Sequence, residues 1–456
     1  MKRYAIEELR KWKENPRRKP LLLMGARQVG KTWLMKEFGR RYFKNVAYVR
    51  FDNSERARSS FSLDFDIPRL LETISIEGKC VINPKNTLII LDEIQECPAA
   101  LTSLKYFCEE AREYAIVAAG SLLGVADHVG TGFPVGKVDL LELYPMSFIE
   151  FLEATQNEQL ADLLQKQDWK LINHFSDLYT RLLRTYMYVG GMPEAVDTYC
   201  KTSNYDEVRR VQHALLSGYR GDFSKHAPSE CLPKLNMVWD SVPQQLSKEN
   251  KRFVYSEVYS GARRKALEVP LRWLKDAGLI SAVPRVKVPR LPMSSYWEGG
   301  ISKVFVLDVG LLGAICDLEA GTLLDRNDIF VEFKGALTEQ FVQQELRASC
   351  ALSPCYWASE EKNAKAEMDF LYSIRGEIVP VEVKGGLNTQ AKSLHVYCQR
   401  FQPKHAVRTS LRPHSCQEIA FKTPQFEHTA CQLTELPLFA VSQMMSIVPK
   451  RVVMDV

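Results

Sequence analysis

The sequence predicts a multidomain α/β protein whose first domain is built on a doubly wound parallel sheet. Two observations support this fold class. First, short apolar runs have the length and composition of parallel strands, at 21–24, 46–51, 87–91 and 115–119. Second, stretches of helical character such as 33–41 and 65–76 lie between these runs. Alternation of strands with helices is typical of a parallel sheet covered by helices.

Length and composition limit the class of protein further. The chain has 456 residues, which predicts two to four domains at ~100–200 residues each. No apolar run approaches the ~18 residues of a membrane span, and residues 1–9 mix charge signs and lack the apolar core of a signal peptide. We therefore expect a cytoplasmic protein with no membrane partner. The net charge of +5 permits a local nucleic-acid surface without arguing for one.

The cysteines fit the same compartment. There are 11, scattered from Cys80 to Cys431, and none forms a C-x-x-C pair. This pattern is typical of reduced thiols in a cytosolic protein and offers no zinc site.

The most informative stretch is the loop that follows the first strand. Residues 25–32 read G-A-R-Q-V-G-K-T, which fits the phosphate-loop pattern G-x-x-x-x-G-K-T between a strand and a helix. Glycines let backbone N–H groups surround an anion, and the helix N-terminus adds partial positive charge. A chance Lys-Thr after a glycine-rich turn is the alternative, but it leaves the strand and the helix unexplained.

This loop predicts a nucleotide site with divided roles. Lys31 reaches the β- and γ-phosphates, and the Thr32 hydroxyl ligates Mg²⁺. The predicted nucleotide-binding residues of the loop are Gly25, Ala26, Arg27, Gln28, Val29, Gly30, Lys31, Thr32 and Trp33.

Two carboxylates follow the apolar strand at 87–91. Asp92 and Glu93 stand at its carboxyl end, where ligands bind in open α/β sheets. Asp92 is expected to hold Mg²⁺ through its water shell, and Glu93 to orient or deprotonate the attacking water. An apolar run ending in Asp-Glu is often only a strand entering a helix cap, but ~60 residues after a phosphate loop it indicates catalysis.

A polar residue after the strand at 115–119 is a further candidate. If that strand lies between the other two, Ser121 could contact the γ-phosphate as a sensor. A helix cap for the residues from Leu122 onward explains Ser121 equally well.

These stretches resemble the AAA+ class of P-loop ATPases. More narrowly, they resemble a prokaryotic ATPase family with a conserved C-terminal region of unknown function. The resemblance covers nearly the whole chain. The matching stretches are 25–32, 91–95, 119–124, 131–137, 143–152, 188–196 and 222–226.

The resemblance implies Mg·ATP as ligand, with Gly25–Thr32 and Asp92-Glu93 as the Walker A and Walker B motifs. An arginine finger cannot be assigned from this sequence. Lys137 and Arg220 are the two basic residues we consider for that role, and without one hydrolysis would be slow. Proteins of this class commonly form rings, so the resemblance allows a homo-oligomer, although the sequence indicates no interface.

The middle of the chain is helix-rich and ends in a pattern that resembles a winged helix. The pattern consists of a short helix at 254–259, a turn at Gly261, a longer helix from Arg263 and strand-like residues through Val288. Such a module places its second helix in the DNA major groove. Packing against neighbouring domains is the alternative, and we leave both open.

The C-terminal third carries acidic residues in a recurring order. Glu339 lies on an amphipathic helix opened at 335–339, Asp369 on one strand, and Glu382 and Lys384 on the next. Residues two apart on a strand face the same side, so Glu382 and Lys384 point together. Three carboxylates could bind Mg²⁺ or Mn²⁺, and Lys384 could polarise a water that attacks a phosphodiester.

This order resembles the PD-(D/E)xK nuclease superfamily, including its G-x-x-x-E helix. One branch also carries a Gln-x-x-x-Tyr motif, which is not evident near Tyr397. Glu382 and Lys384 could instead belong to a cross-strand ion-pair network, because a half-buried strand alternates apolar and charged residues in the same way. Such domains can also keep the fold for binding alone.

We therefore predict four domains with distinct roles. They are a P-loop ATPase core at 1–155, a helical lid or linker at 156–245, a winged-helix-like domain at 246–330 and a restriction-endonuclease-like α/β domain at 331–456. The leading hypothesis is a Mg-dependent ATPase that binds or acts on DNA. The alternatives are a nucleotide-gated, metal-dependent DNA endonuclease, and an ATP-dependent switch that binds a protein partner without cleavage.

Overall fold

The computed structural model describes residues 1–121, 134–248, 251–321, 334–359, 366–386, 392–421 and 429–448. It divides into two compact units, Met1–Tyr144 with Arg272–Leu279, and Pro145–Leu271 with Ile280–Val456. Parts of the predicted stretches 119–124 and 131–137 lie outside the described residues.

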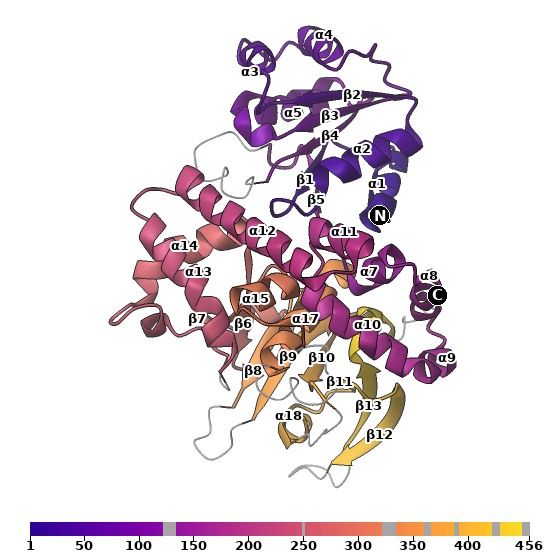
Figure 1. The fold of residues 1–456 in the computed structure, drawn as a ribbon, viewed down its shortest axis with the longest axis vertical. Coiled ribbons are helices and arrows are strands. Elements are labelled where there is room, and N and C mark those ends of the chain that lie inside the picture. The colour runs from indigo at the N-terminus through magenta and orange to yellow at the C-terminus, as the bar shows by residue number, and fades with distance from the viewer. Residues whose placement is uncertain are drawn as a thin grey trace. The chain divides into compact units, whose positions relative to one another are not determined.

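The first unit is built on a five-stranded parallel sheet (Figure 1). The strand order is β2-β3-β4-β1-β5, so β4 lies between β3 and β1, as the sensor hypothesis requires. The strands are β1 (Leu21–Met24), β2 (Asn45–Arg50), β3 (Thr87–Asp92), β4 (Ala115–Ala119) and β5 (Asp139–Glu142). We did not predict β5, because its sequence Asp-Leu-Leu-Glu holds only two apolar residues, and Leu140 is exposed.

Helices cover both faces of this sheet. Residues of α3, α4 and α5 pack in one cluster with Ile89 and Leu91 of β3. On the alternate positions of the same strand, Leu88 lies against Gly39 of α2, because successive side chains of a strand face opposite sides. The helices are α1 (Ala5–Glu14), α2 (Lys31–Tyr42), α3 (Glu55–Phe61), α4 (Ile67–Glu77), η1 (Ile94–Glu96) and α5 (Pro98–Glu110). The predicted doubly wound sheet is confirmed.

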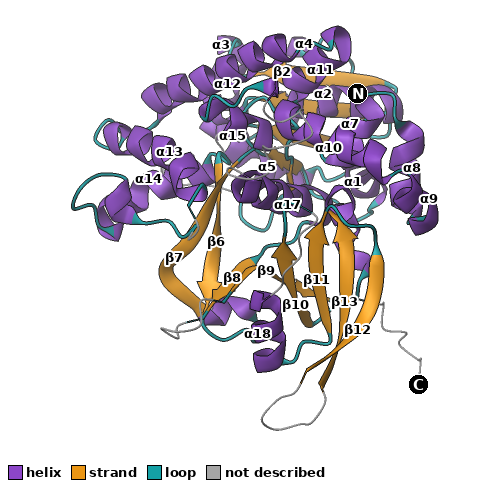
Figure 2. Cartoon of the chain, turned by 60° about the horizontal axis from the view of Figure 1, so that its bottom comes forward, coloured by secondary structure: helices purple, strands orange, loops and turns teal. Residues whose placement is uncertain are grey.

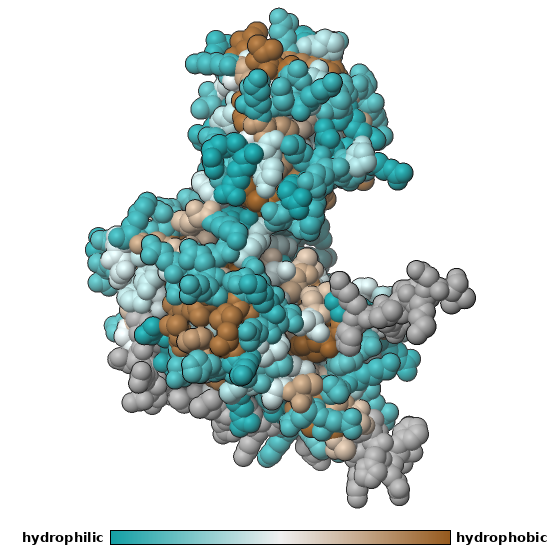
Figure 3. Space-filling view, turned by 90° about the vertical axis from the view of Figure 1, so that its right-hand side faces the viewer, coloured by the Kyte–Doolittle hydropathy of each residue, from teal (hydrophilic) through white to brown (hydrophobic). Residues whose placement is uncertain are grey.

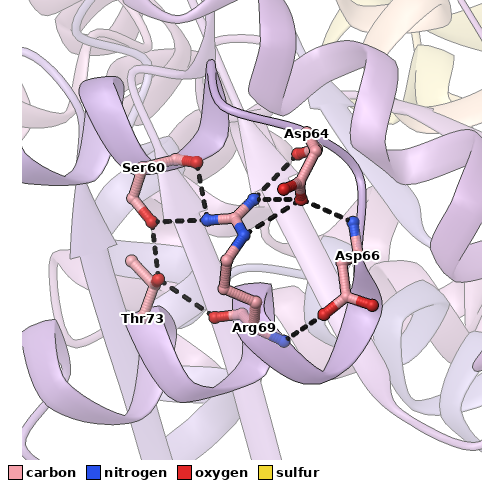
Figure 4. Close-up of polar contacts among 5 residues, drawn as sticks. All are labelled: Ser60, Asp64, Asp66, Arg69 and Thr73. Carbon is pink, nitrogen blue, oxygen red and sulfur yellow. Dashed lines mark hydrogen bonds and ion pairs between the residues drawn. The ribbon is translucent and has the colours of Figure 1, made fainter.

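The connection between α3 and α4 is held by one arginine (Figure 4). Arg69 donates to the Ser60 carbonyl at 2.8 Å and to Asp64 Oδ1 at 2.6 Å. Asp66 caps α4 by accepting from the Arg69 backbone N–H at 3.0 Å, and Ser60 and Thr73 hydroxyls lie 2.7 Å apart. Several charge-assisted bonds on one guanidinium hold this turn.

The second unit begins with a helical region, as predicted for the middle of the chain. Its helices include α7 (Phe148–Ala154), α8 (Glu158–Lys166), α9 (Trp169–His174), α10 (Ser176–Val189), α11 (Pro193–Thr202), α12 (Tyr205–His226) and α13 (Leu232–Leu246). The capping box of Ser147 and Glu150 starts α7. Because α7 packs against α8, α10 and α11, it belongs to this unit, although it lies inside the predicted ATPase range 1–155.

A mixed eight-stranded sheet completes this unit (Figure 2). Its order is β12-β13-β11-β10-β9-β8-β6-β7. The strands are β6 (Ile280–Val286), β7 (Trp297–Val306), β8 (Cys355–Ala358), β9 (Glu367–Ile374), β10 (Glu377–Val383), β11 (His405–Ser410), β12 (Ser415–Phe421) and β13 (Thr429–Pro437). The remaining elements are η2 (Tyr255–Glu257), α14 (Arg264–Asp276), η3 (Met293–Tyr296), α15 (Val309–Ile315), α17 (Lys334–Cys350), α18 (Lys392–Phe401) and η4 (Leu438–Ser446).

The segment predicted as a winged helix contributes strands to this larger sheet. The order of η2, α14 and the antiparallel hairpin β6–β7 follows the prediction. However, β6 also pairs with β8 through Arg285 and Tyr356. The predicted boundary at residue 330 therefore falls between strands of one sheet, and a separate winged-helix domain is not shown.

Gly190 and Gly191, for which the sequence suggested no chemistry, meet a buried carboxylate. Asp308 caps α15, and its Oδ2 also accepts from Gly191 N at 2.7 Å and from the Gln344 amide at 2.9 Å. Gly190 has φ 74°, and a Cβ there would lie 2.1 Å from Asp308 Oδ1. The glycine pair thus permits a close approach that joins α10, α15 and α17.

The surface is mostly polar on the face drawn in Figure 3, with a few hydrophobic patches. Among the described residues, no helix is both long enough and apolar enough to cross a membrane.

Candidate functional site

The predicted phosphate loop lies between β1 and α2 at the carboxyl edge of the parallel sheet. Gly25 has φ 134°, and a Cβ there would lie 2.2 Å from the carbonyl oxygen of Leu143. Gly30 has φ 95° and precedes the first residue of α2. Both positions therefore require glycine, the first for the close approach and the second for the left-handed backbone.

The other loop residues divide between burial and exposure. Ala26 and Val29 are buried and anchor the loop, whereas Arg27, Gln28 and Trp33 are exposed. Trp33 is 41% exposed, which leaves much of its indole on the surface.

Lys31 is buried beside the loop that it is predicted to serve. Its Nζ donates to the carbonyl oxygens of Gly25 at 2.8 Å and Ala26 at 2.7 Å. Burial lowers the pKa of Lys31 to about 8, since a buried ammonium loses hydration. The ammonium is thus held within the loop by carbonyls that a phosphate could replace as partners.

Asp92 stands at the end of β3 and gathers two hydroxyl groups. Its Oδ2 accepts from Thr32 Oγ1 at 2.8 Å and from the Tyr48 hydroxyl at 2.8 Å. Burial and the hydrogen bond to Asp92 raise the pKa of Tyr48, so Tyr48 stays a neutral donor. Hydroxyl and carboxylate oxygens are the ligands that Mg²⁺ prefers, so Thr32 and Asp92 fit a magnesium site.

Glu93 follows Asp92 in an uncommon backbone conformation. Its φ is 52°, a left-handed value that costs energy for a residue with a side chain. Its Oε2 accepts from the Gln95 amide at 2.6 Å. Gln95 Oε1 is buried without a hydrogen-bond partner among the described residues. The carboxylate predicted to act on water is therefore oriented by a neighbouring amide.

Arg3 contacts the loop, whereas Ser121 is placed only by its position in the chain. Ser121 is buried two residues after the end of β4. Arg3 donates to the carbonyl oxygens of Val29 at 2.9 Å and Tyr144 at 2.6 Å, and so ties the N-terminal segment to the loop.

Sequence reasoning missed Arg3, Tyr48 and Gln95. Arg3 and Tyr48 stand outside the motifs, and Gln95 ends the matching stretch 91–95 without a role assigned to it. Tyr48 reaches Asp92 only because β2 pairs with β3. The single available signal was a polar side chain within the strand at 46–51.

The two residues considered as arginine fingers both have partners within the chain. Lys137 pairs with Glu109 at 2.8 Å, and Arg220 pairs with Asp240 at 2.5 Å. Neither pairing tests a role toward another subunit.

Each of the four residues predicted in the C-terminal third lies beside a partner. Asp369 Oδ2 accepts from Val383 N at 2.8 Å, between Glu382 and Lys384. Glu382 contacts Lys384 at 3.2 Å and Arg408 at 3.3 Å. The cross-strand ion-pair network that we considered as the alternative is therefore present, although Glu382 is buried rather than exposed.

Glu339 is paired with lysines rather than aligned with the other carboxylates. Its two oxygens contact Lys251 and Lys303, the latter at 3.2 Å. Within the described residues, no group of three or more His, Cys, Asp or Glu side chains is arranged to hold a metal ion. The metal site predicted at Glu339, Asp369 and Glu382 therefore stays a prediction.

The parallel sheet, the phosphate loop and the paired Asp92 and Glu93 define an AAA-type P-loop ATPase fold. In agreement, residues 17–152 match the AAA domain. Two domains of unknown function, DUF8612 and DUF4143, match residues 180–322 and 334–426. No curated protein matches the chain.

Solved structures align with the chain only distantly. The Walker-type ATPase PABY2304 of Pyrococcus abyssi is 14% identical, with 68% of this chain and 94% of that chain covered and a TM-score of 0.42. The ORC1 protein of Aeropyrum pernix in complex with DNA is 13% identical, covering 69% and 90%, with a TM-score of 0.27. Cdc6p from Pyrobaculum aerophilum is 12% identical, covering 69% and 92%, with a TM-score of 0.25.

Proposed function

We propose that the protein binds Mg·ATP at residues 25–32 and hydrolyses it. The observation that carries this proposal is the 2.8 Å hydrogen bond between Thr32 Oγ1 and Asp92 Oδ2. It brings the hydroxyl of the loop and the carboxylate of β3 to one point beside the phosphate-binding backbone, where a magnesium ion bound to phosphate needs both.

Each residue of the site has a separate task. Thr32 and Asp92 hold magnesium, which neutralises charge on the phosphates when it is bound. Lys31 binds the β- and γ-phosphates with its ammonium. Glu93 orients or deprotonates the attacking water, and Ser121 contacts the γ-phosphate.

Two positioning residues support this machinery. Tyr48 holds Asp92 from β2, and Gln95 holds Glu93 Oε2 at 2.6 Å.

The test compares two variants with wild type. We expect Lys31→Ala to lose ATP binding, and Glu93→Gln to keep binding while turnover falls by about 10²–10⁴-fold. Lys44→Ala, which removes an exposed lysine of the same unit, is the control and should change neither. Unchanged ATP turnover in Lys31→Ala would show that the site is wrongly assigned.

We also propose that the protein binds DNA through a basic surface of the second unit. The supporting observation is that the basic residues around the start of α14 and after β6 are exposed, namely Arg263, Arg264, Lys265, Lys287 and Arg290. Exposed cations bind the phosphate backbone and release counterions.

This proposal predicts a salt-dependent affinity that basic residues control. For duplex DNA, log Kd should rise linearly with the logarithm of the salt concentration. The double variant Arg263→Ala/Lys265→Ala should lower the slope of this line by about 1 for each phosphate contact that is lost. Lys166→Ala, at an exposed lysine of α8 paired with Asp162, should leave the slope unchanged. DNA affinity that the double variant does not alter would refute the basic surface.

The two alternatives from the sequence stand differently. Among the described residues, the C-terminal carboxylates Glu339 and Glu382 are paired with Lys303 and Arg408, so we do not propose a metal-dependent nuclease. A switch that binds a protein partner would be supported by three results together: tight ATP binding, slow ATP turnover and no salt-sensitive DNA affinity.

A further inference from the structure

The C-terminal carboxylate cluster surrounds a lysine. Lys303 of β7 is 1% exposed, and its Nζ lies 3.2 Å from Glu339 Oε2 and 2.5 Å from Glu367 Oε1. Asp369 Oδ1 follows at 3.9 Å, and the ring of Tyr356 covers the ammonium with its centroid at 5.1 Å. The cation therefore stands among three carboxylates, two of which are the predicted metal ligands Glu339 and Asp369.

A second lysine reaches the same helix from an adjacent segment. Arg252 forms an isolated antiparallel bridge with Lys303, and Phe253 N donates to the Ser302 carbonyl at 2.8 Å. This pairing sets Lys251 against the other oxygen of Glu339. Both lysines come from chain segments far from the motif residues, which is why the motif did not indicate them.

The third predicted ligand belongs to another row of charges. Glu382 of β10 lies opposite Arg408 of β11, which in turn lies opposite Glu435 of β13. Arg408 contacts Glu382 at 3.3 Å and Glu435 at 2.5 Å. In-register pairing across three parallel strands keeps Glu382 engaged within the sheet.

A divalent cation would have to compete with these internal cations. A buried ammonium deprived of its carboxylates would be left unpaired, which is strongly unfavourable. An ammonium in contact with the same oxygens also repels a metal ion. The carboxylates therefore cannot serve Lys303 and a metal ion together.

We infer that Lys303 takes the place of a divalent cation, so that the C-terminal cluster is a metal-independent salt-bridge core and not a phosphodiesterase centre. The acidic residues of this cluster then serve the fold. This inference is independent of the ATPase proposal, because it concerns only residues of the second unit.

The test removes the lysine and offers a metal ion in its place, without nucleotide. We expect Lys303→Met to unfold at lower urea concentration than wild type, and Mn²⁺ or Ca²⁺ to restore part of the difference. Mn²⁺, followed by electron paramagnetic resonance, should bind this variant at least about tenfold more tightly than wild type, because three carboxylates lose their internal cation. The divalent ions should no longer restore stability in the double variant Lys303→Met/Asp369→Asn. The control is Lys404→Met, which replaces an exposed lysine and should behave as wild type.

The wild-type protein decides the question if Lys303→Met does not fold. Mn²⁺ binding to wild type that Asp369→Asn abolishes would overturn the inference. So would cleavage of plasmid or linear DNA with Mg²⁺ or Mn²⁺ that Asp369→Ala or Lys384→Ala removes. Wild type without either activity, and with a urea midpoint that divalent ions do not shift, supports the lysine core.

Discussion

Asp92 illustrates how a motif residue depends on neighbours outside the motif. Its carboxylate is buried at a strand end, where an unpaired charge would be costly. Thr32 and Tyr48 both donate to its Oδ2, and the Glu93 backbone N–H donates to Oδ1 at 3.1 Å. These donors fix the carboxylate before any ligand arrives, which lowers the cost of binding.

Tyr48→Phe tests this fixation at the scale of one hydroxyl. Losing a hydrogen bond to a charged group costs about 1.5–3 kcal/mol, so we expect ATP turnover to fall by about tenfold or more. The magnesium concentration for half-maximal turnover should rise. Steady-state kinetics over a magnesium titration measure both. A fall in turnover at unchanged magnesium dependence would argue against positioning of Asp92.

Lys31 predicts a pH dependence of nucleotide binding. Its pKa of about 8 lies below the ordinary value because the side chain is buried, and bound phosphate would raise it. Free protein therefore loses the proton as the pH rises through 8, whereas the complex keeps it. By linkage, ATP affinity should fall above pH 8, by up to about tenfold per pH unit.

Titration of ATP affinity from pH 7 to pH 9.5 measures this effect. Lys31→Arg keeps its charge throughout the range, so its affinity, whatever its absolute value, should lack the decline. A wild-type affinity that stays constant up to pH 9.5 would contradict the lowered pKa.

Helix α17 shows at the scale of an element how a buried helix can be rich in polar residues. Apolar Phe341, Val342 and Leu346 are buried, as predicted, but so are the glutamines on its other sides. Gln340 bonds both backbone groups of Val306, and Gln344 accepts from Val309 N at 2.8 Å. The amides thus replace missing backbone partners at the end of β7, and the helix joins elements that are far apart in sequence.

The contact between Gly191 and Asp308 makes a prediction about this junction. A Cβ at Gly191 would lie 2.2 Å from the Met146 carbonyl oxygen, so Gly191→Ala should destabilise the second unit by about 2 kcal/mol or more. Urea unfolding followed by circular dichroism measures the change. Gly218→Ala in α12, where a Cβ meets nothing within 4 Å, is the control and should stabilise by about 0.5–1 kcal/mol. Equal stability of the two variants would contradict the packing at Gly191.

At the scale of the molecule, each of the two units has its own sheet and its own arrangement of buried charge. The first places its carboxylates at the carboxyl edge of a parallel sheet, beside the phosphate loop. The second buries carboxylates inside a mixed sheet and pairs most of them with cations. Glu345 is an exception among them, because its described contacts are the Phe148 backbone N–H at 2.9 Å and the Ser349 hydroxyl at 3.1 Å.

Glu345 predicts how the stability of the second unit depends on pH. Burial raises its pKa to about 7, so the folded state holds a proton that the unfolded state releases above the ordinary value of about 4.5. The contribution of this carboxyl to the free energy of unfolding is therefore fully present below pH 4.5. It is lost as the pH rises to 7, and the loss is on the order of 2–3 kcal/mol. Urea unfolding at pH 5, 6, 7 and 8 measures the decline, and Glu345→Gln should reduce it. An unchanged pH profile in the variant would exclude Glu345 as its source.

The sequence alone determined what depends on local pattern. Glycine positions, hydrophobic period and spacing predicted the loop at 25–32 and the strands around it. They also predicted the order of the helix and strands that carry Glu339, Asp369 and Glu382. These signals act over a few residues, where backbone sterics and burial of one face decide the conformation. The parallel sheet followed from the same information, whereas the place of β4 between β3 and β1 was a condition of the sensor hypothesis that the structure met.

Only the tertiary structure decided which side chains meet across elements. Tyr48 reaches Asp92 through strand pairing, the hairpin β6–β7 enters the eight-stranded sheet, and Lys303 enters the carboxylate cluster from outside its motif. Motif spacing specifies that acidic residues share a site but not which cation neutralises them. That choice depends on long-range packing, because a buried charge is stabilised by whichever opposite charge the fold brings within contact.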